Sequence, residues 1–209
     1  MRRWIASLAV VAAAGTASGC GSATNHVAQT ATSQTSSQLR GLVPTPLPRK
    51  PDFTLTDTSG RAFTFPARTR AKLTYLYFGY THCPDVCPTT MADLAAALRM
   101  VRPAVRRRVE VVFVTVDPAR DTGPVLRAWL NNYNRSFVGL RGPERAILAA
   151  GRAAGVPLLP PPRTHGHNYA VDHGALVVPY SPDNQAHVVY AQGFHAADYA
   201  HDMALLLSG

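Results

Sequence analysis

Two cysteines lie four positions apart where the sequence changes from a strand pattern to a helix pattern. The apolar run Leu73–Gly79 predicts a buried strand before Cys83, and helix-forming residues at Thr89–Leu98 follow Cys87. Pro88 suits the first position of a helix, so we expect Cys87 near the N-cap, where the helix dipole favours a thiolate. Two such thiolates can either close into a disulfide or hold a soft metal ion.

Strand and helix patterns alternate along the rest of the chain, and they predict one α/β domain. The redox-type cysteine pair at the first strand-to-helix crossover favours a thioredoxin-like fold, with a central mixed β-sheet flanked by helices and an N-terminal β-hairpin. The expected hairpin strands are Phe53–Leu55 and Ala62–Phe65, the later strands are Val109–Val116, Phe137–Leu140, Ala175–Val178 and His187–Tyr190, and the later helices are Val125–Tyr133, Glu144–Ala154 and Ala196–Leu207.

Residues 1–20 have the features of a bacterial lipoprotein signal peptide. Two arginines precede the apolar stretch Trp4–Ala14, and small residues lead into Cys20. The apolar stretch is short for a bilayer span. We therefore expect Cys20 to be lipidated and to become the first residue of the mature chain. A lipidated Cys20 has no free thiol, so Cys83 and Cys87 remain as a pair in an exported protein.

Residues 21–50 are rich in Ser, Thr, Gln and Ala and end in a proline-rich stretch. Because a segment of this composition buries little apolar surface, it predicts a flexible, low-complexity tether. We expect the folded domain to comprise residues 51–209. The net charge of +9 does not indicate a nucleic-acid-binding protein, since no aromatic and basic recognition motif is present and an exported protein does not normally meet nucleic acid.

Three stretches in order resemble the signatures of the Sco/SenC family. They are Tyr77–Pro88, which contains both cysteines, Val114–Thr122, which contains Asp-Pro-Ala-Arg-Asp, and Tyr169–His173. The resemblance covers the chain from about Pro51 to its end. The chain departs from the family pattern at residues 157–167, which include three successive prolines, and at Val178–Tyr180.

Membership of this family would imply a membrane-tethered, thioredoxin-like domain that binds copper, as Cu(I) or Cu(II), through Cys83, Cys87 and His173. Such a protein assists assembly of the binuclear copper centre of cytochrome c oxidase. The implied partners are subunit II of the oxidase or another cuproprotein, a protein that reduces the thiols, and the membrane through a lipid anchor. The implied location is the extracytoplasmic face of a bacterial cell membrane, and the implied role is that of a metallochaperone.

The chemistry of the residues leaves other readings open. Thiolates with an imidazole also suit zinc, although a structural zinc site normally has four ligands. Cys83 and Cys87 could instead be a redox-active pair, in a thiol–disulfide oxidoreductase of the cell envelope without a copper-transfer role. A distant imidazole such as His173 distinguishes the two functions, because dithiol exchange does not need it. A peroxidase of the peroxiredoxin kind is disfavoured, since Tyr80 and Pro84 stand where that class places a threonine.

Other polar residues near these motifs have simpler interpretations. His82 is expected to serve local packing, and His165 and His167 are expected to be surface residues, with an auxiliary role in metal capture as the alternative. Asp85 has two interpretations: it forms the turn, or it shifts the pKa of the thiols or contacts a partner. Two further residues, Asp117 and Asp121, are expected to form a turn and cap the next helix, with partner docking or dithiol tuning as alternatives.

Overall fold

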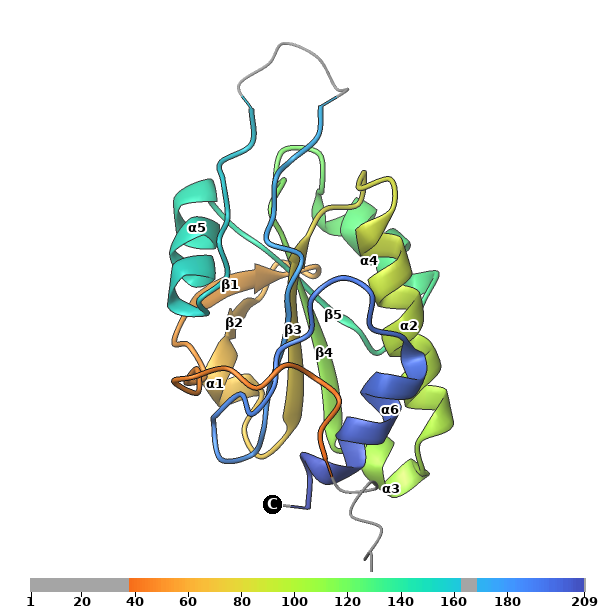
Figure 1. Cartoon of the computed structure of the whole chain (residues 1–209). Coiled ribbons are helices and arrows are strands. Elements are labelled where there is room, and N and C mark those ends of the chain that lie inside the picture. Colours follow the sequence, from red (N-terminus) through yellow and green to blue (C-terminus); the bar gives the residue numbers. More distant parts are fainter. Residues whose placement is uncertain (1–37, 163–168, 209) are drawn as a thin grey trace, which may run out of the picture. The chain divides into compact units, whose positions relative to one another are not determined.

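The computed structural model describes residues 38–162 and 169–208 (Figure 1). Within them, one six-stranded sheet has the order β2-β1-β5-β4-β3-β6. β3, β4 and β5 are parallel, whereas β1–β2, β1–β5 and β3–β6 are antiparallel pairs. The strands are β1 (Thr54–Asp57), β2 (Ala62–Thr64), β3 (Leu73–Gly79), β4 (Val109–Thr115), β5 (Val138–Arg141) and β6 (Val177–Tyr180).

Helices cover both faces of this sheet. Figure 1 shows α2, α4 and α6 on one side and α1 and α5 on the other. The helices are α1 (Phe65–Arg68), α2 (Val86–Met100), α3 (Pro103–Arg106), α4 (Gly123–Asn131), α5 (Glu144–Ala153) and α6 (Ala196–Leu205). The predicted α/β class, with a thioredoxin-like mixed sheet and an N-terminal hairpin, is confirmed.

The central strand β3 is buried on both faces, as its continuous apolar pattern predicts. All seven of its residues are buried. Because side chains alternate along a strand, Tyr75 and Tyr77 pack in the core beneath α2, α4 and α6, whereas Leu76 and Phe78 pack in the core beneath α1 and α5. This double burial fixes the end of β3, and with it the start of the segment that carries the cysteines.

The strand expected at His187–Tyr190 does not form. Val189 makes one isolated bridge to Leu42, and Tyr190 makes one to Val177. The N-terminal segment that faces these residues has prolines at positions 44, 46 and 48, which have no N–H to donate. A continuous ladder therefore cannot form, and single bridges replace it.

A buried carboxylate fastens the N-terminal segment to α6. Asp202 accepts hydrogen bonds from the backbone amides of Arg40 and Gly41 and from the hydroxyl of Tyr190, all at 2.9 Å. These contacts lie ahead of Pro51, where the composition places the start of the folded domain. Among the described residues, no helix combines the length and the apolar character needed to cross a bilayer.

We expect Asp202→Ala to lower the free energy of unfolding by about 3 kcal/mol, because it leaves two buried donors, the Gly41 amide and the Tyr190 hydroxyl, and the part-buried Arg40 amide without their acceptor. The control is Asp183→Ala, which removes an exposed ion pair with His187 (2.7 Å) and should cost less than about 1 kcal/mol. Urea unfolding of the full chain measures both. Equal, small losses in the two variants would show that the contact of Asp202 does not stabilise the domain.

Candidate metal centre

Three side chains of types that can ligate a metal meet at the carboxyl end of β3. Cys83 lies in the turn that follows this strand, Cys87 lies in the first turn of α2, and His173 lies in the segment that leads into β6. The two sulfurs and an imidazole nitrogen all lie within 4.8 Å of one another. Both cysteines are free thiols. The carboxyl ends of parallel strands are the usual position of a ligand site in an open α/β sheet.

The two thiols have different surroundings. The Cys87 side chain is fully buried, and its Sγ lies 3.4 Å from His173 Nε2 and 3.6 Å from the hydroxyl of Tyr77. Cys83 is only half-buried, and its Sγ accepts the backbone N–H of Cys87 at 3.4 Å. Solvent therefore reaches the site through Cys83, whereas Cys87 forms its inner wall.

This arrangement separates the acidities of the two thiols. A hydrogen bond from the Cys87 thiol lowers the pKa of Cys83 to about 4, and the backbone amide of Cys87 adds to the effect. The same contact with Cys83, together with burial, raises the pKa of Cys87 above its usual value. At neutral pH the pair is one thiolate and one thiol.

The expectation that the helix N-terminus favours a thiolate at Cys87 is not met, because the contact with Cys83 and burial raise the pKa of Cys87. α2 begins at Val86, with Asp85 as its N-cap, so Pro88 is the third residue of the helix rather than the first. The helix N-terminus consequently presents the Cys87 amide to the Cys83 sulfur, and Cys83 receives the stabilisation that we expected for Cys87.

His173 is held by aromatic rings and by a backbone bridge. The rings of Tyr80 and Tyr77 meet its imidazole edge-on, with centroids 5.6 and 6.0 Å away. Leu158 forms an antiparallel bridge with His173, and the amide of Gly174 donates to the carbonyl of Pro157 at 2.8 Å. The proline-rich departure from the family pattern thus begins with residues that support His173. No role for Tyr77, Tyr80 or Leu158 at the site was inferred from the sequence.

Gly79 makes room for the buried sulfur. A Cβ at this position would lie 2.6 Å from Cys87 Sγ and 3.0 Å from a ring carbon of Phe113. Any larger residue would displace the sulfur or the end of β3. The sequence did indicate a special position, because a glycine at the end of a buried strand often marks a place where another atom packs against the backbone. Only the fold shows that this atom is the Cys87 sulfur.

The remaining candidate residues lie outside the three-residue group. His82 is half-exposed, and its Nδ1 lies 3.0 Å from Thr81 Oγ1 and 3.8 Å from a carboxylate oxygen of Asp121. Asp85 is exposed at the N-cap of α2 without a side-chain capping bond. Asp117 and Asp121 are fully buried in the loop between β4 and α4. His165, His167 and Cys20 lie outside the described residues.

The donor set suits a soft metal ion. Two sulfurs and one imidazole nitrogen converge from two separate segments. Three ligands leave a coordination position open for exchange with another molecule, which differs from a closed four-ligand structural zinc site. The same two sulfurs are near enough to form a disulfide after a modest rearrangement.

We expect alkylation of Cys83 in the reduced, metal-free chain to proceed at a constant rate from about pH 5.5 to pH 8. Because its pKa is depressed to about 4, the thiolate is present above that pH and is lost as the pH falls through it. Peptide mass spectrometry after timed iodoacetamide pulses gives the rate, with N-acetylcysteine as the control whose rate rises over this range. A Cys83 rate that climbs tenfold per unit between about pH 6 and pH 8 would contradict the assignment.

Comparison with known proteins identifies the family. The family model described as SCO1/SenC matches residues 44–208. A putative copper-binding protein of Stutzerimonas stutzeri is 32% identical over 140 residues, which are 66% of this chain and 68% of that protein. The mitochondrial protein SCO2 homolog of Bos taurus is 34% identical over 134 residues, 63% of this chain but only 50% of the bovine protein.

Comparison with solved structures leads to the same family. The structure of Bradyrhizobium japonicum ScoI with copper bound matches with a TM-score of 0.65 at 30% sequence identity, and the match covers 75% of this chain and 98% of that one. Because the family model spans well over half of the sequence, this chain belongs to the SCO1/SenC family.

Proposed function

We propose that the chain binds a copper ion through Cys83 Sγ, Cys87 Sγ and His173 Nε2. The observation that carries this proposal is the convergence of two sulfurs and one imidazole nitrogen within 4.8 Å. Two soft donors and an imidazole suit Cu(I) and Cu(II). The relatives described as copper-binding or solved with copper support the choice of copper over zinc.

The copper ion, in this proposal, is cargo for another protein, delivered to subunit II of cytochrome c oxidase or to another cuproprotein. Cys83 is the thiol that a partner can reach, because it is half-buried whereas Cys87 is fully buried. An incoming ligand of the recipient would therefore replace Cys83 first, and Cys87 and His173 would retain the ion until transfer is complete.

A second candidate function uses the same thiols without copper. The Cys83 thiolate could attack a disulfide in a partner and form a mixed disulfide, which Cys87 would then resolve. Two electrons would pass to the partner, leaving its cysteines reduced and Cys83 and Cys87 joined. The low pKa of Cys83 beside a protonated Cys87 favours this chemistry. A further thiol reductant protein would then have to restore the pair.

Copper titration of the reduced full chain separates the two functions. We expect His173→Ala to weaken copper binding by at least about tenfold, since it removes one of three ligands, and full oxidation of Cys83 and Cys87 to abolish the site. His187→Ala is the matched control, because His187 pairs with Asp183 on the surface. If His173→Ala bound copper as tightly as wild type, the metal site would be wrong and the oxidoreductase function would be favoured.

We further propose that residues 1–20 are a lipoprotein signal, that Cys20 carries the lipid, and that the segment after it tethers the family domain to the extracytoplasmic face of a bacterial membrane. The support is the sequence alone, namely the small residues that lead into Cys20 and the polar composition that follows.

Mass spectrometry of the chain purified from membranes should show an N-terminus at Cys20 with a mass increment for acyl chains. Cys20→Ser should abolish the increment and release the protein from the membrane fraction. An unmodified mature chain that begins at another residue would contradict the lipid anchor.

A further inference from the structure

The loop between β4 and α4, residues 117–122 and hereafter the 117–122 loop, contains two carboxylates with no exposed surface, Asp117 and Asp121. Buried carboxylates require hydrogen-bond donors. Helix capping, the interpretation favoured from the sequence, does not occupy them, because the hydroxyl of Thr122 accepts the amide of Val125 at the start of α4. The expected turn does form, since the amide of Arg120 donates to Asp117 Oδ1 at 3.4 Å and the amide of Asp121 donates to the carbonyl of Asp117 at 2.9 Å. Both carboxylates also contact other segments of the chain.

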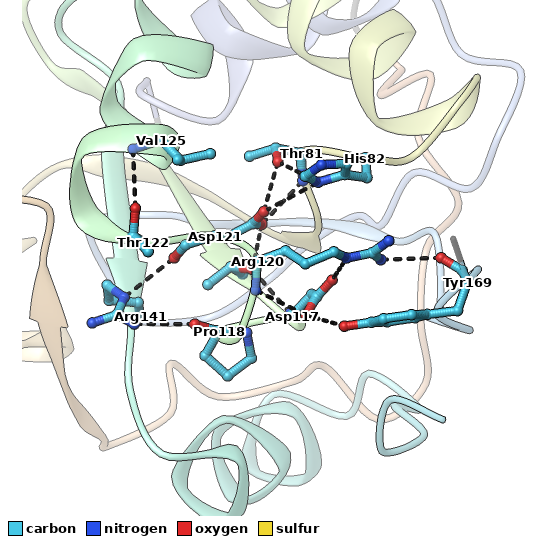
Figure 2. Close-up of polar contacts among 11 residues, drawn as sticks. Thr81, His82, Asp117, Pro118, Arg120, Asp121, Thr122, Val125, Arg141 and Tyr169 are labelled. Carbon is cyan, nitrogen blue, oxygen red and sulfur yellow. Dashed lines mark hydrogen bonds and ion pairs between the residues drawn. The ribbon is translucent and has the colours of Figure 1, made fainter. Parts of the chain in front are cut away.

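Asp121 holds the segment that leads into the first cysteine. Its Oδ2 accepts the backbone N–H of Thr81 at 3.0 Å, and its Oδ1 accepts the hydroxyl of Thr81 at 2.6 Å. Figure 2 shows the carboxylate directed toward Thr81 and His82. Thr81 lies two residues before Cys83, so this contact fixes the backbone from which Cys83 projects.

Asp117 holds the segment that leads into His173. Its Oδ1 accepts the hydroxyl of Tyr169 at 2.9 Å, and its Oδ2 forms an ion pair with Arg120 (Figure 2). Arg120 also donates to the carbonyl of Tyr169 at 3.0 Å, and its guanidinium lies 3.6 Å from the centroid of the Tyr169 ring. Tyr169 is thereby held at its hydroxyl, ring and carbonyl, four residues before His173.

Further hydrogen bonds hold the 117–122 loop itself in place, so the contacts of Asp117 and Asp121 are fixed relative to each other. The hydroxyl of Thr115 donates to Asp121 Oδ2 at 2.6 Å and accepts the amide of Asp117 at 3.0 Å. Arg141, at the end of β5, donates to the carbonyls of Asp121 and Pro118 at 3.2 and 3.1 Å. The loop is therefore fixed to the sheet on one side and to both ligand-bearing segments on the other.

We infer that Asp117, Arg120 and Asp121 are positioning residues that set the separation between Cys83 and His173. Arg120 extends this role through Tyr80, whose ring lies 5.6 Å from the guanidinium and 5.6 Å from the imidazole of His173. By holding the two segments before a metal ion arrives, the 117–122 loop reduces the ordering that binding would otherwise require. The consequence for copper rests on the proposed function.

Tyr169→Phe tests the inference without opening a cavity. It removes the hydroxyl that binds Asp117 but keeps the ring beneath Arg120. Tyr180→Phe is the matched control, because the buried hydroxyl of Tyr180 has no hydrogen-bond partner among the described residues. Both variants are made in the full chain, alone and combined with His173→Ala.

We expect Tyr169→Phe to lower copper affinity about tenfold, the lower end of the effect of residues that orient metal ligands. The reduction potential of the Cys83–Cys87 pair should stay at its wild-type value, because the loop orients the histidine segment relative to the cysteines and does not change the distance between the two sulfurs. In the His173→Ala background, Tyr169→Phe should have no further effect on affinity. A tenfold loss that persists in that background would overturn the inference.

Hydrogen exchange of the metal-free chain provides a readout that does not depend on copper. Amides in residues 169–176 should exchange faster in Tyr169→Phe than in wild type or Tyr180→Phe. Unchanged exchange in this segment would overturn the positioning role whatever the copper data show. If wild type bound no copper but the exchange difference appeared, the proposed function would fail and the positioning role would stand.

Discussion

The contact between the sulfur of Cys87 and the end of β3 is the constraint on which the metal centre depends. β3 is buried on both faces and cannot shift, so the position of Gly79 is fixed by the core. A Cβ on Gly79 would lie 2.6 Å from Cys87 Sγ, which places the sulfur against the backbone of the strand. α2 then starts in one position, the amide of Cys87 donates to the Cys83 sulfur, and His173 closes the site from the segment before β6.

This geometry gives the two cysteines different tasks. The inner thiol is buried and contacts His173, and its hydrogen bond to Cys83 together with burial raises its pKa above the usual value. The outer thiol is half-buried and ionised at neutral pH. A metal ion that bound as proposed would meet one thiolate that is already formed, and its binding to the second sulfur would release a proton. In the proposed function, copper affinity and thiol redox chemistry would therefore depend on the same pair of sulfur atoms.

The sequence predicted the parts of the fold that local pattern controls. The bounds of β3 were as expected, since a continuous apolar run between turns indicates a strand buried on both faces. Spacing and motif order also singled out Cys83, Cys87 and His173, which the structure brings together. The strand expected at His187–Tyr190 was wrong, because its pairing is decided by prolines of a segment more than a hundred residues away.

Contacts between distant segments explain the other differences. Pro88 suggested where α2 begins, but the first turn starts at Val86. The contact with Cys83 and the burial of its side chain raise the pKa of Cys87. Asp117 and Asp121 follow a strand and precede a helix, a pattern typical of turns and caps. The turn forms as expected, but the carboxylates also bind Tyr169 and Thr81, which lie 52 and 40 residues away in the sequence. A local pattern contains no information about such partners.

X-ray absorption at the copper edge, on the reduced full chain loaded with one equivalent of copper, tests the central claim most directly. The account predicts two sulfur scatterers and one imidazole nitrogen in the first coordination shell, with the imidazole contribution lost in His173→Ala. A shell with one sulfur or none, or an imidazole contribution that persists in His173→Ala, would contradict the assignment of Cys83, Cys87 and His173 as the copper ligands.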